Sequence, residues 1–454
     1  MKKENKPSVS KIFKMIKKKD VKFVKLQFTD ILGTVKSVMI SVDNFSESIE
    51  KGTWFDGSSI EGFARICESD MFLKPDISTF AILPWRPKEK AVGRVICDVY
   101  NTKSKPFKGD PRFILKKILK KAWDEFGFIY NTGPEIEFFL FKKKETEENG
   151  EFLPVPHDIG SYFDFSPLDL ASNVRRDIIF ALEKFGIKSE TSHHEVAPGQ
   201  HEIDIKYDEA LNMADKSVTF KYTVKAISSA HGLYASFMPK PIFGINGSGM
   251  HVHQSLFDKK GKNVFFNKKD KYKLSDIAYS FIAGQLEHIK AMSAILNPIV
   301  NSYKRLVPGY EAPVYICWGQ VNRSALIRIP RYSKGREKST RAELRSPDPS
   351  CNPYLAFAVM LAAGLDGIER NLSPPEPVEE DVYNFNDEKL KSLGIDTLPE
   401  SLDEAIKELK KDKVIRDAIG DHIYKFFLKA KKSEWKEYST QVTKWELRRY
   451  LEYT

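Results

Sequence analysis

The order of strand-forming and helix-forming segments constrains the fold of this chain more than any other feature of its sequence. Short β-like runs, such as 21–28, 35–40 and 92–99, fill the first hundred residues. Beyond them, strand-like segments are grouped between long helical ones, and no regular β-α-β alternation appears. This order predicts an α+β fold, in which helices flank an antiparallel sheet.

The length of the chain, 454 residues, is too great for one ordinary core. A loop that contains Pro106 and Gly109 precedes a predicted helix over 111–126, which has Pro111 in its first turn. We therefore expect a small domain over 1–106 and a larger one over 107–454. In the larger domain we expect strands at 135–141, 201–205, 250–256, 325–329 and 341–345, and helices at 168–185, 277–296, 353–368 and 402–409.

Charge, cysteine content and hydropathy exclude several classes of protein. The 72 Lys and Arg exceed the 62 Asp and Glu by +10, but the basic residues are dispersed among acids, which argues against a nucleic-acid-binding protein. The four cysteines form no C-x-x-C pair and suit a reducing compartment. The longest apolar run, 355–365, is too short to span a bilayer, and the basic N-terminal stretch has no signal-peptide core. We expect a cytoplasmic protein.

Two carboxylates, Glu135 and Glu137, lie two residues apart in the apolar segment 133–139. Side chains alternate between the two faces of a strand, so these carboxylates share one face. Like charges that are enclosed together are unfavourable unless cations neutralise them. The pattern therefore indicates metal ligation; an exposed acidic strand face is the alternative.

Further acidic and imidazole side chains follow along the chain. They are Glu190, Glu195, Glu202, His251, His253 and Glu343. Each single histidine or acid has an ordinary structural explanation, but several same-face pairs in one chain favour a site. Ligands that are mostly oxygen favour Mg²⁺ or Mn²⁺ over Zn²⁺, and paired ions suit phosphoryl transfer.

Cationic side chains gather near Glu343 in the sequence: Arg323, Arg328, Lys338, Arg341 and Arg345. The planar fork of arginine suits phosphates and carboxylates, although surface salt bridges are an alternative use. The sequence contains neither a P-loop nor the glycine-rich loop of protein kinases with its partner motifs. A nucleotide would therefore be bound by some other arrangement.

Together these segments resemble type I glutamine synthetase of bacteria and archaea. The matching stretches are 55–59 (Phe-Asp-Gly-Ser-Ser), 133–138, 193–202, 246–253, 301–313, 322–330 and 341–349. The resemblance implies a small N-terminal β-grasp domain before the catalytic domain. It also implies ATP-dependent ligation of ammonia to the γ-carboxylate of L-glutamate, through a γ-glutamyl phosphate, which gives L-glutamine, ADP and phosphate.

The resemblance also assigns ligands to these residues. One cation, Mg²⁺ or Mn²⁺, would be held by Glu137, Glu195 and Glu202, and another by Glu135, His251 and Glu343. The nucleotide would contact Glu190, Tyr207, His253, Ser255, Lys338 and Arg341. Glutamate would lie against Asn246, Gly247, Arg305, Glu311 and Arg345.

Four residues receive catalytic roles from the same resemblance. Asp56 would create the ammonium site and take a proton, and Glu311 would cap the site on a mobile flap. Arg323 and Arg328 would stabilise the transferring phosphoryl group. The implied assembly is a homo-dodecamer of two stacked hexameric rings, in which the Asp56 loop enters the site of the neighbouring subunit.

The resemblance is to the shorter, feedback-regulated subclass, in which the arginine at position 65 would mediate allosteric inhibition by glutamine. Some relatives carry a modifiable tyrosine shortly after the position of residues 370–372, where this chain has Ser373 and two prolines, which argues against control by adenylylation. A small regulatory protein is a further expected partner. Two alternatives stay open: a sibling ligase that uses a larger amine, and a homologue without catalytic activity.

Overall fold

The computed structural model describes residues 8–58, 60, 70–86, 89–143 and 153–453. Within these residues the N-terminal part forms a five-stranded sheet in the order β2-β1-β5-β4-β3. Its strands are β1 (Phe23–Thr29), β2 (Val35–Ser41), β3 (Thr53–Asp56), β4 (Asp70–Ile82) and β5 (Val92–Asn101). Strand β1 pairs with β5 in parallel, and the other neighbours are antiparallel.

Local side-chain chemistry explains why this small sheet forms. In the β1–β2 hairpin the Asp30 carboxylate accepts the N–H groups of Leu32 and Thr34, and Gly33 takes a φ of +86°, which side chains disfavour. Helix α1 (Val9–Lys18) buries Ile12 and Ile16 against the sheet, and α2 (Phe45–Lys51) follows β2.

A larger, nine-stranded sheet occupies the rest of the described chain, with the main order β12-β13-β14-β11-β6-β8-β7. Strands β9 and β10 also pair with β6. The bounds are β6 (Ile129–Lys142), β7 (Ser189–His194), β8 (Gln200–Ile205), β9 (Asp208–Glu209), β10 (Leu233–Ser236), β11 (Met250–Phe257), β12 (Trp318–Gly319), β13 (Ile327–Arg328) and β14 (Ala342–Leu344). Its pairs are antiparallel except β12–β13, so the predicted antiparallel sheet is confirmed.

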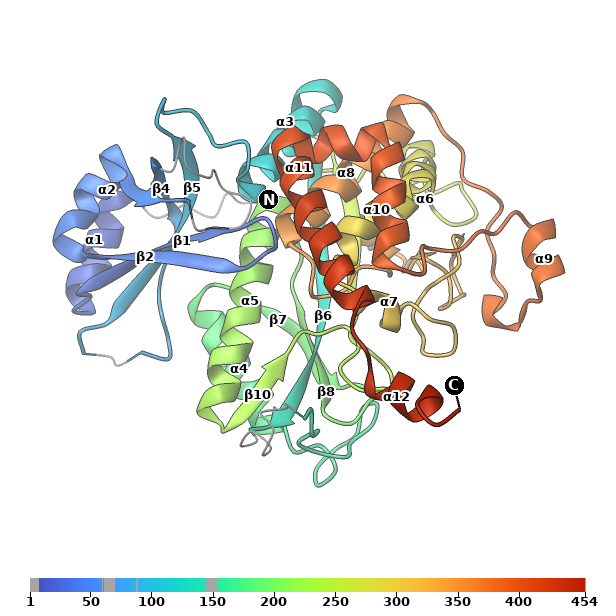
Figure 1. The fold of residues 1–454 in the computed structure, drawn as a ribbon. Coiled ribbons are helices and arrows are strands. Elements are labelled where there is room, and N and C mark those ends of the chain that lie inside the picture. Colours follow the sequence, from blue (N-terminus) through green and yellow to red (C-terminus); the bar gives the residue numbers. More distant parts are fainter. Residues whose placement is uncertain (1–7, 59, 61–69, 87–88, 144–152, 454) are drawn as a thin grey trace.

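Helices cover this sheet, and several of them lie together above it in Figure 1. They are α3 (Pro111–Phe126), α4 (Ser172–Lys184), α5 (Ala210–Ala230), α6 (Asp276–Leu296), α7 (Ser302–Arg305), α8 (Pro353–Glu369), α9 (Asp387–Ser392), α10 (Leu402–Lys411), α11 (Lys413–Ser439) and α12 (Lys444–Tyr450). Helices α6 and α8 approach closely because Gly284 and Gly367 lie at their crossing. A Cβ at Gly284 would lie 2.2 Å from the Ala363 carbonyl oxygen.

Four sequence predictions need correction. The predicted helix 168–185 begins only at Ser172, because residues before it form a loop whose Asp169 carboxylate accepts the Ala171 N–H group. The strands expected at 325–329 and 341–345 are shorter, as β13 and β14. Strand β6 is longer than the predicted 135–141, and helices α5 and α11 were not predicted.

The two sheets are joined by a buried ionic network around Arg112 on α3. Its guanidinium contacts Asp76 on β4 at 2.8 Å, Asp98 on β5 at 2.7 Å and Asp215 on α5 at 2.8 Å. Tyr354 on α8 donates to Asp215 as well. The small sheet is therefore fixed against the helices that support the large one. Among the described residues, no helix is both long enough and apolar enough to cross a membrane.

Candidate active site

The candidate site lies on one face of the large sheet, where β6 runs between β11 and β8. The registers place Glu135 opposite His251 and Glu137 opposite Glu202. Because Ile136 between the two acids is fully buried on the other face, both carboxylates point to the same side. The alternation seen in the sequence therefore predicts their shared face correctly.

The first donor group consists of Glu135, His251 and Glu343, and its ligand atoms lie within 4.8 Å of one another. His251 Nδ1 is 3.4 Å from Glu135 Oε2 and 3.9 Å from Glu343 Oε1. The other Glu135 oxygen lies 2.7 Å from His253 Nε2. The structure thus brings together the three residues that the family resemblance assigned to one cation.

The second donor group differs in one member from the predicted set. Glu195 and Glu202 are joined by His193, again within 4.8 Å, with His193 Nε2 at 3.3 Å from Glu202 and Nδ1 at 3.5 Å from Glu195. Glu137, directly opposite Glu202, instead accepts the Gly249 N–H at 3.0 Å and the Gln200 amide at 2.8 Å. His193 was missed, although its position two residues before Glu195 was a usable signal.

The three glutamates of this region repel each other's charge. Burial, followed by nearby carboxylates, raises the pKa of Glu195 to about 8, and burial raises the pKa of Glu137 to about 7. Burial likewise raises the pKa of Glu202 well above its usual range. Enclosed carboxylates that resist ionisation together form a favourable site for a divalent cation.

The first donor group behaves differently because imidazoles and arginines already balance it. Burial opposes ionisation of Glu135, but hydrogen bonds from His251 and His253 outweigh it and lower the pKa of that carboxyl. Burial and the charge of Arg345 lower the pKa of His251 to about 4, which keeps the ring neutral and able to ligate.

Arginines surround Glu343, whose side chain is fully buried. Arg328 Nε donates to one of its oxygens at 2.6 Å and Arg345 to the other at 2.7 Å. Arg341 Nε donates to His253 Nδ1 at 3.1 Å. These bonds hold three cationic heads at the edge of the first donor group, where an anionic substrate could meet them.

Residues predicted to bind glutamate lie next to the second group. Arg305 is buried, and its guanidinium donates to the carbonyl oxygens of Ser346 at 2.8 Å and Arg345 at 3.2 Å. The Asn246 amide contacts Glu311 at 3.3 Å. The charge of Glu311 also contributes to the raised pKa of Glu195, which places the predicted flap beside the site.

The remaining predicted residues are more dispersed. Ser255 is buried on β11, Tyr207 is half exposed over Gly133, and Glu190, Arg323 and Lys338 are on the surface. Asp56 ends β3 on the small sheet, is exposed, and accepts the Ser58 N–H at 2.8 Å. Arg65 lies outside the described residues. Within the described single chain, Asp56 is therefore not part of the donor groups.

The fold and the site define a class of enzyme: an α+β protein whose large sheet presents carboxylates, imidazoles and arginines on one face. Comparison with known families specifies it further. The family described as "Glutamine synthetase, beta-Grasp domain" matches residues 20–102, and "Glutamine synthetase, catalytic domain" matches residues 108–450. The chain belongs to the glutamine synthetase family, and its first sheet is the β-grasp domain that the sequence predicted.

Individual relatives agree with this assignment. The chain is 54% identical to a glutamine synthetase of Thermotoga maritima over 98% of its length and 99% of the relative's. It is also 54% identical to one of Methanosarcina mazei over 97% of both chains. A solved structure titled "GmaS/ADP complex-Conformation 1" has a TM-score of 0.87 at 32% identity, covering 97% of this chain and 99% of that one. The structure of a Plasmodium falciparum glutamine synthetase has a TM-score of 0.87 at 27% identity, covering 99% of this chain and 100% of that one.

Proposed function

We propose that this site joins ammonia to the γ-carboxylate of L-glutamate at the expense of ATP, giving L-glutamine, ADP and phosphate by way of a γ-glutamyl phosphate. The observation that carries the proposal is the convergence, on one sheet face, of two carboxylate–imidazole groups with the arginines around Glu343. Such a step would assimilate ammonium into organic nitrogen.

The residue types suit this chemistry. A carboxylate is a poor acylating agent, because its oxygen is a poor leaving group, and phosphorylation of glutamate supplies a good one. Arg328 is held by Glu343 at the edge of the first donor group, and arginine stabilises the charge that develops on a transferring phosphoryl group. Arg323, in the turn that precedes β13, would add to this stabilisation.

The donor sets fit divalent cations. Both groups offer carboxylate oxygens with one imidazole each, and the carboxylates of the second group are enclosed together and resist ionisation. Oxygen-rich ligation of this kind suits Mg²⁺ or Mn²⁺. We assign Glu135, His251 and Glu343 to one ion, and Glu137, Glu195 and Glu202 to the other, with the His193 imidazole beside the last two. When bound, such ions would screen the charge of the triphosphate.

Substrate positioning would follow from the surrounding residues. Buried Arg305, fixed by backbone carbonyls, would face the glutamate carboxylate together with Asn246, Gly247 and Arg345. The nucleotide would lie along the opposite side, near Glu190, Tyr207, His253, Ser255, Lys338 and Arg341. Glu311, on a loop beside Glu195, would close over the site and exclude water from the acyl phosphate.

Asp56 is proposed to act in a neighbouring subunit. It is an exposed carboxylate at the end of a strand of the small sheet, so it is free to reach another chain. There it would attract ammonium and take its proton before attack. A homo-dodecamer of two stacked rings would supply this neighbour, and the domain division at 106/107 would separate the Asp56-bearing part from the catalytic part.

We also propose a cytoplasmic location and membership of the shorter, feedback-regulated subclass. In that subclass Arg65 would mediate allosteric inhibition by glutamine, and a small regulatory protein would be a further partner. The support is the sequence around residues 61–65 and the replacement of the modifiable tyrosine by Ser373 and two prolines.

Ammonium-dependent phosphate release from ATP and glutamate tests the proposal. We expect release only when glutamate, ammonium and Mg²⁺ or Mn²⁺ are all present, with glutamine identified by mass spectrometry. Release that requires a larger amine would favour the sibling-ligase alternative, and no release with any amine would favour a homologue without catalytic activity.

A further inference from the structure

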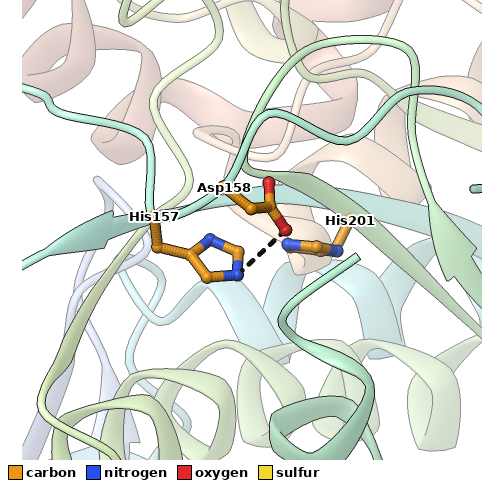
Figure 2. A group of neighbouring side chains, drawn as sticks. All are labelled: His157, Asp158 and His201. Atoms are coloured by element: carbon orange, nitrogen blue, oxygen red, sulfur yellow. Dashed lines mark ion pairs between the residues drawn. The ribbon is translucent and has the colours of Figure 1, made fainter. Parts of the chain in front are cut away.

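A buried cluster of histidines and acids lies behind the second donor group. It contains His157, Asp158 and His201, whose ligand atoms come within 4.8 Å of one another (Figure 2). Among the described residues, His201 Nε2 is buried and has no hydrogen-bond partner, whereas His157 Nε2 lies 3.1 Å from Asp158 Oδ2. An additional metal site is the first explanation that such a cluster suggests.

Arg175 argues against that explanation. Its guanidinium lies 2.9 Å from His201 Nδ1, and because arginine can only donate, Nδ1 must accept. A ring whose Nδ1 accepts a hydrogen bond is neutral and carries its single proton on Nε2. A protonated nitrogen cannot ligate a cation. In this arrangement the three side chains do not form a metal site.

The carboxylate of Asp158 has a different role, because it is a hub for hydrogen bonds. Its side chain is fully buried. Oδ1 accepts from His194 Nε2 at 3.0 Å and from the Gly199 N–H at 2.9 Å. Oδ2 accepts from the Leu170 N–H at 3.1 Å and lies 3.1 Å from His157 Nε2. Both oxygens are thus engaged by donors from three separate segments.

These donors lie on both sides of the turn that carries the second donor group. His194 ends β7, immediately before Glu195, and Gly199 immediately precedes β8, which contains Glu202. His194 also donates through Nδ1 to the Glu195 carbonyl oxygen at 2.7 Å. The hydrogen bonds of His194 to Asp158 and to the Glu195 carbonyl therefore fix the backbone at Glu195, one proposed ligand. The hydrogen bond from Gly199 to Asp158 fixes the start of β8, the strand that carries Glu202, the other proposed ligand.

We propose that Asp158 and His194 are positioning residues, which hold Glu195 and Glu202 at the separation that a divalent cation requires. The inference rests on the proposed role of those two glutamates as cation ligands. Neither positioning residue touches the cation or the substrates. Outer residues that orient ligands in this way commonly change metal affinity by about 10- to 100-fold when they are replaced.

Asp158→Asn tests the proposal with almost no change in shape. The amide puts an NH₂ group where one carboxylate oxygen of Asp158 accepts hydrogen bonds. That NH₂ group would then face the N–H donors of neighbouring residues, and those hydrogen bonds would be lost. Calorimetric titration of the full-length, metal-stripped enzyme with Mn²⁺ should then show one site weakened by about 10-fold or more, with the other unchanged. The KM for ATP at saturating Mn²⁺ should stay within about twofold.

Asp270→Asn is the matched control. Asp270 also closes a loop by accepting several hydrogen bonds, from the N–H groups of Tyr272 and Leu274 and from the Tyr279 hydroxyl. A general loss of stability should lower the melting temperature of both variants. Only Asp158→Asn should also weaken Mn²⁺ binding.

Two replacements of His194 keep the test decisive even where Asp158→Asn folds poorly. The amide of glutamine can replace Nε2 and still donate to Asp158, whereas that of asparagine can replace only Nδ1. His194→Asn should therefore weaken Mn²⁺ binding more than His194→Gln.

The outcomes separate the inference from the proposed function. If the unaltered enzyme binds no Mn²⁺, the proposed ligand roles fail. If it binds two ions and Asp158→Asn binds them equally well, the positioning role is wrong and Asp158 is only structural. Copurification of one tightly bound zinc ion, lost in Asp158→Asn, would overturn the donor–acceptor argument and restore the metal-site explanation.

Discussion

Binding of a divalent cation should release protons from this enzyme near neutral pH. Burial and mutual repulsion hold the pKa of Glu195 at about 8 and that of Glu137 at about 7, and the pKa of Glu202 is also raised. At pH 7 the metal-free site therefore keeps one or more of these carboxyls protonated. A cation needs ionised ligands, so its binding must displace those protons.

The magnitude follows from the pKa shifts. Each pH unit corresponds to about 1.4 kcal/mol, so the rise for Glu137 from 4.5 to about 7 amounts to about 3 kcal/mol, and the rise for Glu195 to about 5 kcal/mol. The carboxylates influence one another, so these two figures are not added. We expect the raised pKa values to contribute about 3 to 5 kcal/mol to the free energy of unfolding of the metal-free protein. This stability of the metal-free protein is fully present below pH 4.5 and is lost as the pH rises through about 7 to 8.

The assay is Mn²⁺ calorimetry in buffers of different ionisation enthalpy, which counts released protons. We expect about one to two protons per chain at pH 7 and almost none above pH 9. Thermal unfolding in EDTA should show a falling melting temperature over the same range, restored by the cation. Glu137→Gln should reduce the proton count and make the metal-free protein more stable at pH 8. A count near zero at pH 7 would refute the reasoning.

Three substitutions test other parts of the site. Asp56→Ala should raise the KM for ammonium far more than it changes ATP binding, as measured by steady-state kinetics and calorimetry. Glu311→Ala should leave Mn²⁺ affinity nearly unchanged but increase ATP hydrolysis that is not coupled to glutamine formation, because the flap loses its charge. Gly249→Ala would place a Cβ 2.6 Å from the buried Arg305 guanidinium, and displacing that group should cost about 2 kcal/mol, or about 30-fold in kcat/KM for glutamate.

Each of the three has a result that would contradict it. Equal losses in ammonium and ATP use would remove the special role of Asp56. Weakened Mn²⁺ binding in Glu311→Ala would make Glu311 a ligand instead of a flap residue. An unchanged kcat/KM for glutamate in Gly249→Ala would show that Arg305 does not bind glutamate.

The donor strands were predictable because their signal is local. Glu135 and Glu137 share a face by the two-residue period of a strand alone, and the structure agrees. What the period cannot supply is register. That Glu135 lies opposite His251, and Glu137 opposite Glu202, depends on pairings between segments 65 to 116 residues apart.

Helix α5 was missed for a chemical reason. Its buried side includes Ser217, Thr219 and Thr223, whose hydroxyls each donate to a carbonyl oxygen four residues earlier. Satisfied in this way, polar side chains can be buried, but they remove the apolar periodicity that identifies a helix in a sequence. The proposed positioning role of Asp158 was equally invisible, since an aspartate in a loop looks like a solvated turn residue.

The most direct test of the two-cation site is a crystal of the enzyme with Mn²⁺ and data collected at the manganese absorption edge. The account predicts two anomalous peaks per chain, one among Glu135, His251 and Glu343 and the other beside Glu195 and Glu202. Peaks absent from both places, or a peak only at His157, Asp158 and His201, would contradict it.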